Sequence, residues 1–200
     1  MKHLIRSAGW LIAVGILSLS ATFAWRQWTH PAISQAEQAL KERQWLAVLP
    51  ANSYDNRPLA VALPVPDAKL PHSRVMAAYL AMLGTQVTAV ILLSETQGYG
   101  GPIRLTIAID PNGRLIGSQV LEQQESPGLG ARIGDPQLNW LGQFANRHLK
   151  DHWALKRDQG DFDQLAGATV TSRAVIEALQ DALSYFDAHR QVLLEAPVHE

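Results

Sequence analysis

The strongest constraint on this chain is a run of 19 residues, 7–25, without a charged side chain. As a helix this run would be roughly 28 Å long, close to the thickness of a bilayer core. Lys2 and Arg6 precede it, so the positive-inside tendency predicts a cytoplasmic N-terminus and an outer location for the rest of the chain. We expect a single transmembrane helix within residues 1–28 that contacts membrane lipid and anchors the protein.

A cleaved signal peptide is the alternative interpretation of this segment. Thr22-Phe23-Ala24 could serve as a signal-peptidase site, although Phe23 and Trp25 fit such a site poorly. Residues 29–72 are expected to link the anchor to a domain. Apolar residues at helical spacing predict a membrane-proximal helix over 32–49, and five prolines between residues 50 and 71 then predict an extended linker, with short extended pieces such as 59–63.

The remaining chain predicts one mixed α+β domain over residues 73–192, with a tail at 193–200. Residues 86–94 are rich in Val, Ile and Thr, and 104–109 alternate with Leu105, Ile107 and Ile109 on one face. Asp-Pro-Asn-Gly at 110–113 predicts a turn into a return strand over 115–121. The segment 74–83 suits a helix about as well as a strand. Helices are expected over 136–149 and, with an apolar stripe at 175, 176, 179, 183 and 186, over 171–189.

Composition excludes several classes of function. Seventeen Lys and Arg against 18 Asp and Glu give a net charge of −1, so no basic face for nucleic acid is expected. The chain has no cysteine, which rules out disulfides, thiolate metal sites and cysteine nucleophiles. No histidines show a convincing metal-ligand spacing, and His148 and His152 are expected in a solvated turn. We therefore expect no metal, and any redox chemistry has to come from a cofactor.

Three glycine-bearing loops could form a binding site, at 97–101, 125–130 and 163–172. Any one of them could be a plain turn. The third leads directly into the helix expected at 171–189, and Thr169, Thr171 and Ser172 could each cap that helix. A helix N-terminus offers unpaired N–H groups and a partial positive charge, which suit a phosphate. Spacing alone leaves open whether Thr169 is a cap or holds a phosphate as an ester.

The third loop also carries a resemblance. Asp163-x-x-Ala166-Gly167-Ala168-Thr169 resembles the flavinylation motif of the FMN-binding domain family, Asp-x-x-Ser/Thr-Gly-Ala-Thr. Further family-like motifs follow in family order: Gly98-Tyr99-Gly100-Gly101-Pro102-Ile103, Asp110 with Gly113, the Glu-Ser-Pro-Gly-Leu-Gly loop at 125–130, and Gly160-Asp161-Phe162-Asp163. With the N-terminal span, the pattern is similar to the G-subunit family of Rnf/Rsx-type ion-translocating electron-transport complexes.

The resemblance implies a covalent cofactor. Thr169 would carry FMN through a phosphoester made by a separate flavin transferase, and Asp163 would help that transferase to recognise the loop or would order it. Gly167 and Ala168 would let the phosphate and ribityl chain pass close to the backbone. The family has Ser or Thr where this chain has Ala166, so one hydroxyl contact to the flavin would be missing.

The same resemblance places the flavin ring. Glu125, Ser126, Leu129 and Gly130 would line the isoalloxazine side, and Tyr99 would lie nearby. Where the family has threonine after the glutamate this chain has Ser126, which keeps the hydroxyl. No residue is implied to be catalytic in its own right.

The function implied is an electron relay in a bacterial inner-membrane complex that couples ferredoxin/NAD-type electron transfer to ion movement. The domain would lie on the periplasmic side, with other membrane subunits as partners, and would turn over no substrate of its own. The alternatives are a module that binds phosphate reversibly, a structural tether for membrane proteins, and the corresponding subunit of the sodium-pumping quinone reductase, which has a longer chain.

Overall fold

The computed structural model describes residues 15, 18–20, 22, 23, 25, 40, 42–66 and 68–195. It divides into two compact units, Met1–Arg43 and Gln44–Glu200. Most of the expected anchor at 7–25 and the first part of the expected helix at 32–49 lie outside the described residues, as does most of the tail. Within the described part of the chain no helix has both the length and the apolar character needed to cross a membrane. The domain boundaries at 28/29, 72/73 and 192/193 stay predictions.

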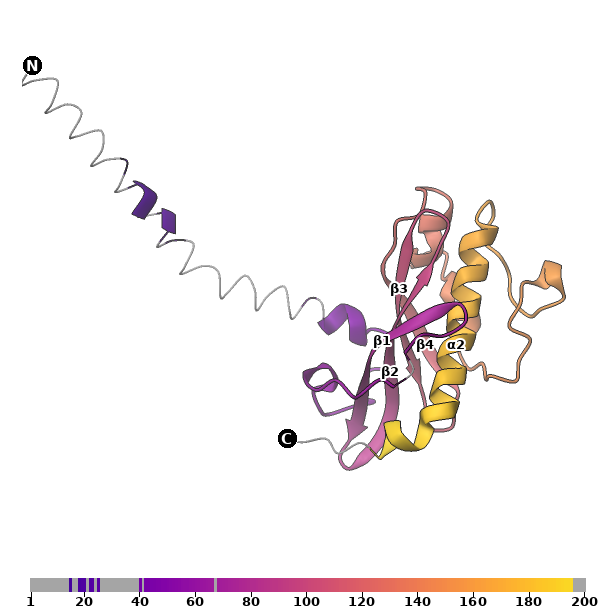
Figure 1. Cartoon of the computed structure of the whole chain (residues 1–200), viewed down its shortest axis with the longest axis horizontal. Helices are drawn as coiled ribbons and strands as arrows, with labels where there is room; N and C mark the ends of the chain where they lie inside the picture. Colours follow the sequence, from indigo (N-terminus) through magenta and orange to yellow (C-terminus); the bar gives the residue numbers. More distant parts are fainter. Residues whose placement is uncertain are drawn as a thin grey trace, which may run out of the picture. The chain divides into compact units, whose positions relative to one another are not determined.

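The second unit is built on one antiparallel sheet in the order β1-β2-β3-β4 (Figure 1). Its strands are β1 (Ser73–Leu83), β2 (Gln86–Gln97), β3 (Pro102–Ile109) and β4 (Leu115–Glu122). Each strand pairs with the next along the chain, so the sheet is a simple meander. The ambiguous segment 74–83 is therefore a strand. The predicted strands at 86–94, 104–109 and 115–121 are confirmed.

The β3–β4 hairpin turns where the sequence predicted it. The Asp110 side chain accepts hydrogen bonds from the amides of Asn112 and Arg114, both at 2.9 Å. Gly113 has φ +83°, a backbone conformation that residues with a side chain adopt only with strain. The aspartate, the proline and the glycine together close this turn, because each matches the backbone geometry at its own position.

Helix α2 (Thr169–Leu194) lies along one face of the sheet (Figure 1). It begins two residues before and ends five residues after the predicted 171–189. Its predicted apolar stripe is buried, and it packs against the face of β3 that carries Leu105, Ile107 and Ile109. Each such side chain stabilises the fold by about 1.5–3 kcal/mol on burial. Most of the core therefore lies between α2 and the sheet.

The opposite face of the sheet is also partly covered. Val48 and Leu49 pack there in a second cluster with Ile91 and Ala108. For this reason Ala108, on the face of β3 opposite Leu105, Ile107 and Ile109, is completely buried. Beside the sheet, residues 58–60 form a short 3-10 helix, η1 (Pro58–Ala60), where an extended piece over 59–63 was expected. Among residues 59–63 only Leu63 makes a bridge, and its amide donates to the Ala78 carbonyl at 2.8 Å.

The predicted helix over 136–149 is wrong. Residues 136–149 lie within the long connection between β4 and α2 and contain one short 3-10 helix, η3 (Trp140–Phe144); another, η2 (Gly130–Gly134), precedes them. Asn139 and Asn146 both have positive φ, and Ala145 between η3 and Asn146 is extended, so an α-helix cannot pass through them. Phe144 instead packs on Trp153 and Phe162, with ring centroids 6.1 and 4.8 Å away. Aromatic packing beyond this segment decides its conformation.

Asp181 ties α2 to the start of β1, which leads to a first prediction. Its buried carboxylate accepts hydrogen bonds from the His72 amide (2.8 Å) and the Ser73 hydroxyl (2.9 Å). Asp181→Ala leaves both donors without an acceptor. It should lower the free energy of unfolding by about 2–4 kcal/mol in urea titrations. Glu177→Ala is the matched control one turn earlier, because it removes only a partly exposed pair with His72 and should cost less than about 1 kcal/mol. Equal costs would contradict the role of Asp181.

A second prediction concerns pH. Glu95 on β2 accepts from Arg104 at 2.9 Å and from Arg74 at 3.0 Å, and these contacts, Arg104 foremost, hold the pKa of Glu95 below its ordinary 4.5. A lowered folded pKa means that the stabilisation is complete above pH 4.5 and is lost as the pH falls through the folded value. Glu95→Gln should therefore be less stable than the wild type at about pH 7, and thermal unfolding should show this gap closing as the pH falls below 4.5. A gap independent of pH would contradict the assignment.

Candidate functional site

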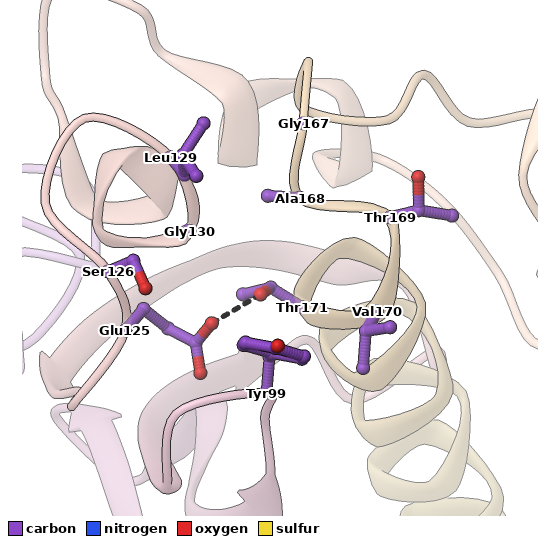
Figure 2. Close-up of a pocket in the computed structure, with 10 residues that line it drawn as sticks. All are labelled: Tyr99, Glu125, Ser126, Leu129, Gly130, Gly167, Ala168, Thr169, Val170 and Thr171. Carbon is purple, nitrogen blue, oxygen red and sulfur yellow. Dashed lines mark hydrogen bonds between the residues drawn. The ribbon is translucent and has the colours of Figure 1, made fainter.

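Three loops surround one pocket of about 430 Å³ at one end of the sheet (Figure 2). They are the turn between β2 and β3, the segment after β4, and the start of α2. The residues that line the pocket are Tyr99, Glu125, Ser126, Leu129, Gly130, Gly167, Ala168, Thr169, Val170 and Thr171. All the residues predicted for the site are present except Asp163, and Val170 and Thr171 are additions.

The meander explains why these loops meet. Neighbouring antiparallel strands end at opposite ends of a sheet, so the end of β2 lies beside the end of β4, with the start of β3 between them. The loop at 98–101 and the segment at 125–130 therefore leave the sheet at the same end. Helix α2 begins there as well, and its side chains line the same pocket. The fold brings together residues that lie far apart in the chain.

Glu125 is the group that joins the three loops. Its side chain is buried, with 7% of the residue exposed. One carboxylate oxygen accepts a hydrogen bond from the Gly100 amide at 2.9 Å. The other accepts from the Thr171 hydroxyl, a bond drawn in Figure 2. One side chain thus connects the β2–β3 turn, the segment after β4 and the first turn of α2.

The surrounding glycines leave room for this carboxylate. A Cβ atom on Gly130 would lie 2.5 Å from Glu125 Oε2 and 2.8 Å from Thr171 Oγ1. A Cβ atom on Gly98 would collide with Glu125 Oε1. Neither glycine has a positive φ, so close approach is the reason that side chains are excluded there. Glycines that the sequence suggested as turns instead form the walls around Glu125.

The start of α2 has no side-chain cap, although the sequence offered three residues that could cap it. Thr169 is its first residue and contacts Gln164 Oε1 at 3.2 Å, and Thr171 donates to Glu125. The Ser172 hydroxyl accepts from the Leu165 amide (2.9 Å) and donates to the Ala168 carbonyl (2.8 Å). None of these side chains caps the helix, because other contacts engage each of them.

An uncapped helix start leaves amide donors free. The amides of Thr169, Val170 and Thr171 make no hydrogen bond to an acceptor within the described part of the chain. The first amides of a helix carry a partial positive charge, so they form a site for an anion. All three residues line the pocket. The wall of the pocket that α2 provides is therefore suited to a phosphate.

The pocket mouth is apolar and exposed. Tyr99 is 75% exposed, Val170 52% and Leu129 47%, high values for large apolar side chains gathered at one pocket. Leu129 and Gly167 lie across the pocket from Tyr99 and Val170 (Figure 2). Gly167 has φ +75°, and a Cβ atom there would lie 2.8 Å from the Leu129 side chain. This rim suits a flat, apolar ligand.

Asp163 lies outside the pocket. Its exposed carboxylate pairs with Lys156 at 2.6 Å. Its carbonyl accepts from Trp140 Nε1 at 2.7 Å, and its amide donates to Gln143 Oε1 at 2.8 Å. The structure thus places Asp163 in the strap, residues 163–168, that leads to Thr169. The contacts from Trp140 and Gln143 had no local signal in the sequence.

Comparison with known proteins defines the class. Residues 98–184, which contain all three pocket loops, match the FMN-binding domain family. The matched segment therefore includes the pocket, strands β3 and β4, and the part of helix α2 up to residue 184.

Full-length relatives define the family more closely. The chain is 42% identical over 199 residues to the G subunit of the ion-translocating oxidoreductase complex of Pseudomonas aeruginosa, covering 95% of this chain and 91% of that one. It is 32% identical to the G subunit from Vibrio vulnificus, covering 100% of this chain and 97% of that one. The chain belongs to the G-subunit family of ion-translocating oxidoreductase complexes. Among solved structures, Shewanella oneidensis NqrC aligns with a TM-score of 0.48 and 22% identity, over 58% of this chain and 60% of that one.

The packing around Glu125 gives a third prediction. Gly130→Ala should displace the carboxylate, break its bond to Thr171 and lower the free energy of unfolding by about 1–3 kcal/mol. Gly134→Ala is the matched control, because it lies in the same 3-10 helix and its Cβ atom would meet only Val120 at an ordinary 3.6 Å. We expect that variant to change stability by less than about 0.5 kcal/mol. Urea unfolding measures both, and equal effects would contradict close packing around Glu125.

Proposed function

We propose that this protein is an electron carrier that holds FMN in the pocket, linked by a phosphoester to Thr169 Oγ1. One observation carries the proposal. The hydroxyl of Thr169 and three amides without an acceptor among the described residues lie together at one wall of a pocket with an apolar rim. A phosphate on this hydroxyl would lie at the N-terminus of α2, where helix geometry favours an anion.

The other residues fit a flavin ring. A pocket of about 430 Å³ is within the usual range for cofactor-sized ligands, and Tyr99, Leu129 and Val170 offer apolar surfaces. Gly167 and Ala168 keep the backbone close to the pocket, because they add little or no side chain. Bound FMN would supply reversible electron storage, which no side chain of this cysteine-free chain provides. The protein would hold the phosphate, shield the ring and adjust its potential.

The attachment site is open to a modifying enzyme. Thr169 lies at the pocket edge, and its hydroxyl contacts the exposed Gln164 side chain at 3.2 Å. Ester formation would join Thr169 Oγ1 to the flavin phosphorus, release the hydroxyl proton and expel a leaving group. A flavin transferase would therefore need a flavin nucleotide with an activated phosphate, such as a phosphoanhydride. In this proposal Asp163 and the strap it anchors form the surface that the transferase recognises.

The names of the relatives support a role for the carrier in a larger assembly. The relatives are named as G subunits of an ion-translocating oxidoreductase complex, and we propose the same role here. The chain would pass electrons between other subunits in ferredoxin/NAD-type transfer coupled to ion movement. The helix expected within residues 1–28 would anchor it in the bacterial inner membrane, with the domain on the periplasmic side. Subunit contacts, and no separate substrate, would then define its activity.

In-gel flavin fluorescence tests the covalent link. The full chain is expressed with an active flavin transferase, denatured, and examined under ultraviolet light on a gel. We expect a fluorescent band for the wild type and for Thr169→Ser, which keeps a hydroxyl. Thr169→Val has nearly the same shape as threonine but no hydroxyl, so its band should be weaker by at least about tenfold. The difference isolates the hydroxyl as the requirement.

Two outcomes would contradict this assignment. Fluorescence retained in Thr169→Val would place the link on another residue. A wild-type band without fluorescence, while the same transferase labels a second substrate, would contradict the covalent attachment of flavin. Flavin that co-purifies but is lost on denaturation would then favour reversible binding through the amides at the start of α2.

A further inference from the structure

Glu125 is a buried acidic group that pairs with no basic side chain in the part of the protein that the structure describes. Both carboxylate oxygens accept hydrogen bonds, one from the Gly100 amide and one from the Thr171 hydroxyl. Among the described residues no Lys, Arg or His forms an ion pair with it. An ionised carboxylate is an acceptor only, so it could make both of these hydrogen bonds. A charge on this carboxylate would be stabilised by these two neutral donors.

A structural role alone does not require that charge. Two neutral donors could be satisfied by an amide side chain of the same size, without the desolvation cost of a buried ion. The glycines at 98 and 130 nevertheless leave space for a carboxylate at this position, and its oxygens reach into the lining of the pocket (Figure 2). A negative charge in such a partly dehydrated place acts more strongly on its neighbours than a surface charge does.

We propose that the Glu125 carboxylate sets the reduction potential of the flavin held in this pocket. This inference rests on the function proposed above. Each electron added to the flavin from a donor makes the ring one unit more negative unless a proton follows. A fixed negative charge beside the ring opposes that addition and lowers the potential. Glu125 would therefore make the carrier a stronger reductant, in addition to joining the three loops.

Glu125→Gln isolates the charge. The glutamine oxygen can accept from the Gly100 amide, and its NH₂ group can donate to the Thr171 hydroxyl, so size and hydrogen bonding are kept. A purely structural role would leave the potential unchanged. If the charge sets the potential, Glu125→Gln should have a higher midpoint potential than the wild type. The expected rise is at least about 59 mV, which corresponds to a tenfold change in the one-electron equilibrium constant. Glu125→Asp keeps the charge and should stay close to the wild type.

The matched control is Glu122→Gln. It removes the same formal charge three residues earlier, where the side chain is 67% exposed and pairs with Arg104 at 2.8 Å. Solvent and salt screen such a charge, so its potential should equal that of the wild type. The shift in Glu125→Gln should persist in about 1 M salt, because a buried charge is screened much less.

Spectroelectrochemical titration of the flavin-loaded full chain with dithionite and mediators makes the measurement. A flavin-loaded Glu125→Gln protein with the wild-type potential would overturn this inference and leave the flavin carrier intact. A wild type without flavin would overturn the proposed function itself, and this inference with it. Equal shifts in Glu122→Gln and Glu125→Gln would also overturn it, since they would show a general charge effect.

Infrared difference spectroscopy tests the same proposal if Glu125→Gln binds too little flavin for a titration. The reduced-minus-oxidised spectrum of the loaded wild type should contain a carboxylate band, because charging the ring perturbs a neighbouring carboxylate. That band should move in Glu125→Asp and remain in Glu122→Gln. A spectrum without a carboxylate band that depends on Glu125 would overturn the proposal.

Discussion

The carboxylate of Glu125 is the interaction on which the pocket depends. It holds the Gly100 amide and the Thr171 hydroxyl, and so fixes the β2–β3 turn and the first turn of α2 to the segment after β4. Gly98 and Gly130 are glycines because the carboxylate fills the space of a side chain. By engaging Thr171, Glu125 also takes away one residue that could have capped the helix. The amides at the start of α2 then stay available to a ligand.

The rest of the domain supplies a rigid support for this arrangement. The apolar stripe of α2 packs on the sheet, and Asp181 fixes the middle of the helix to the start of β1. Trp140 and Gln143 hold the backbone of Asp163, and so position the strap that leads to Thr169. A cofactor attached at Thr169 would be held by the most regular element of the fold. Such a support is what a carrier of fixed potential requires.

Local patterns in the sequence predicted much of this fold, and tertiary contacts explain the remainder. Alternation and turn chemistry located β2, β3 and β4, and helical spacing located α2, because these signals are strong within a short window. The prediction of a helix over 136–149 was wrong because Asn139 and Asn146 take left-handed conformations and Phe144 packs on aromatic rings from later in the chain. Thr171 could have capped the helix, but its hydroxyl bonds to Glu125, which lies 46 positions away in the chain. The pocket residues were predicted by resemblance and glycine content, whereas Val170 and Thr171 had no separate signal as pocket residues.

A crystal structure of the flavin-loaded full chain would show whether these three loops together hold the flavin. We predict electron density continuous from Thr169 Oγ1 into a phosphate that accepts hydrogen bonds from the amides at the start of α2. We also predict that the ring contacts Tyr99 and Leu129, with Glu125 still bonded to Thr171. A flavin attached at another residue, or a ring lying outside this pocket with the amides unoccupied, would contradict this assignment of the pocket.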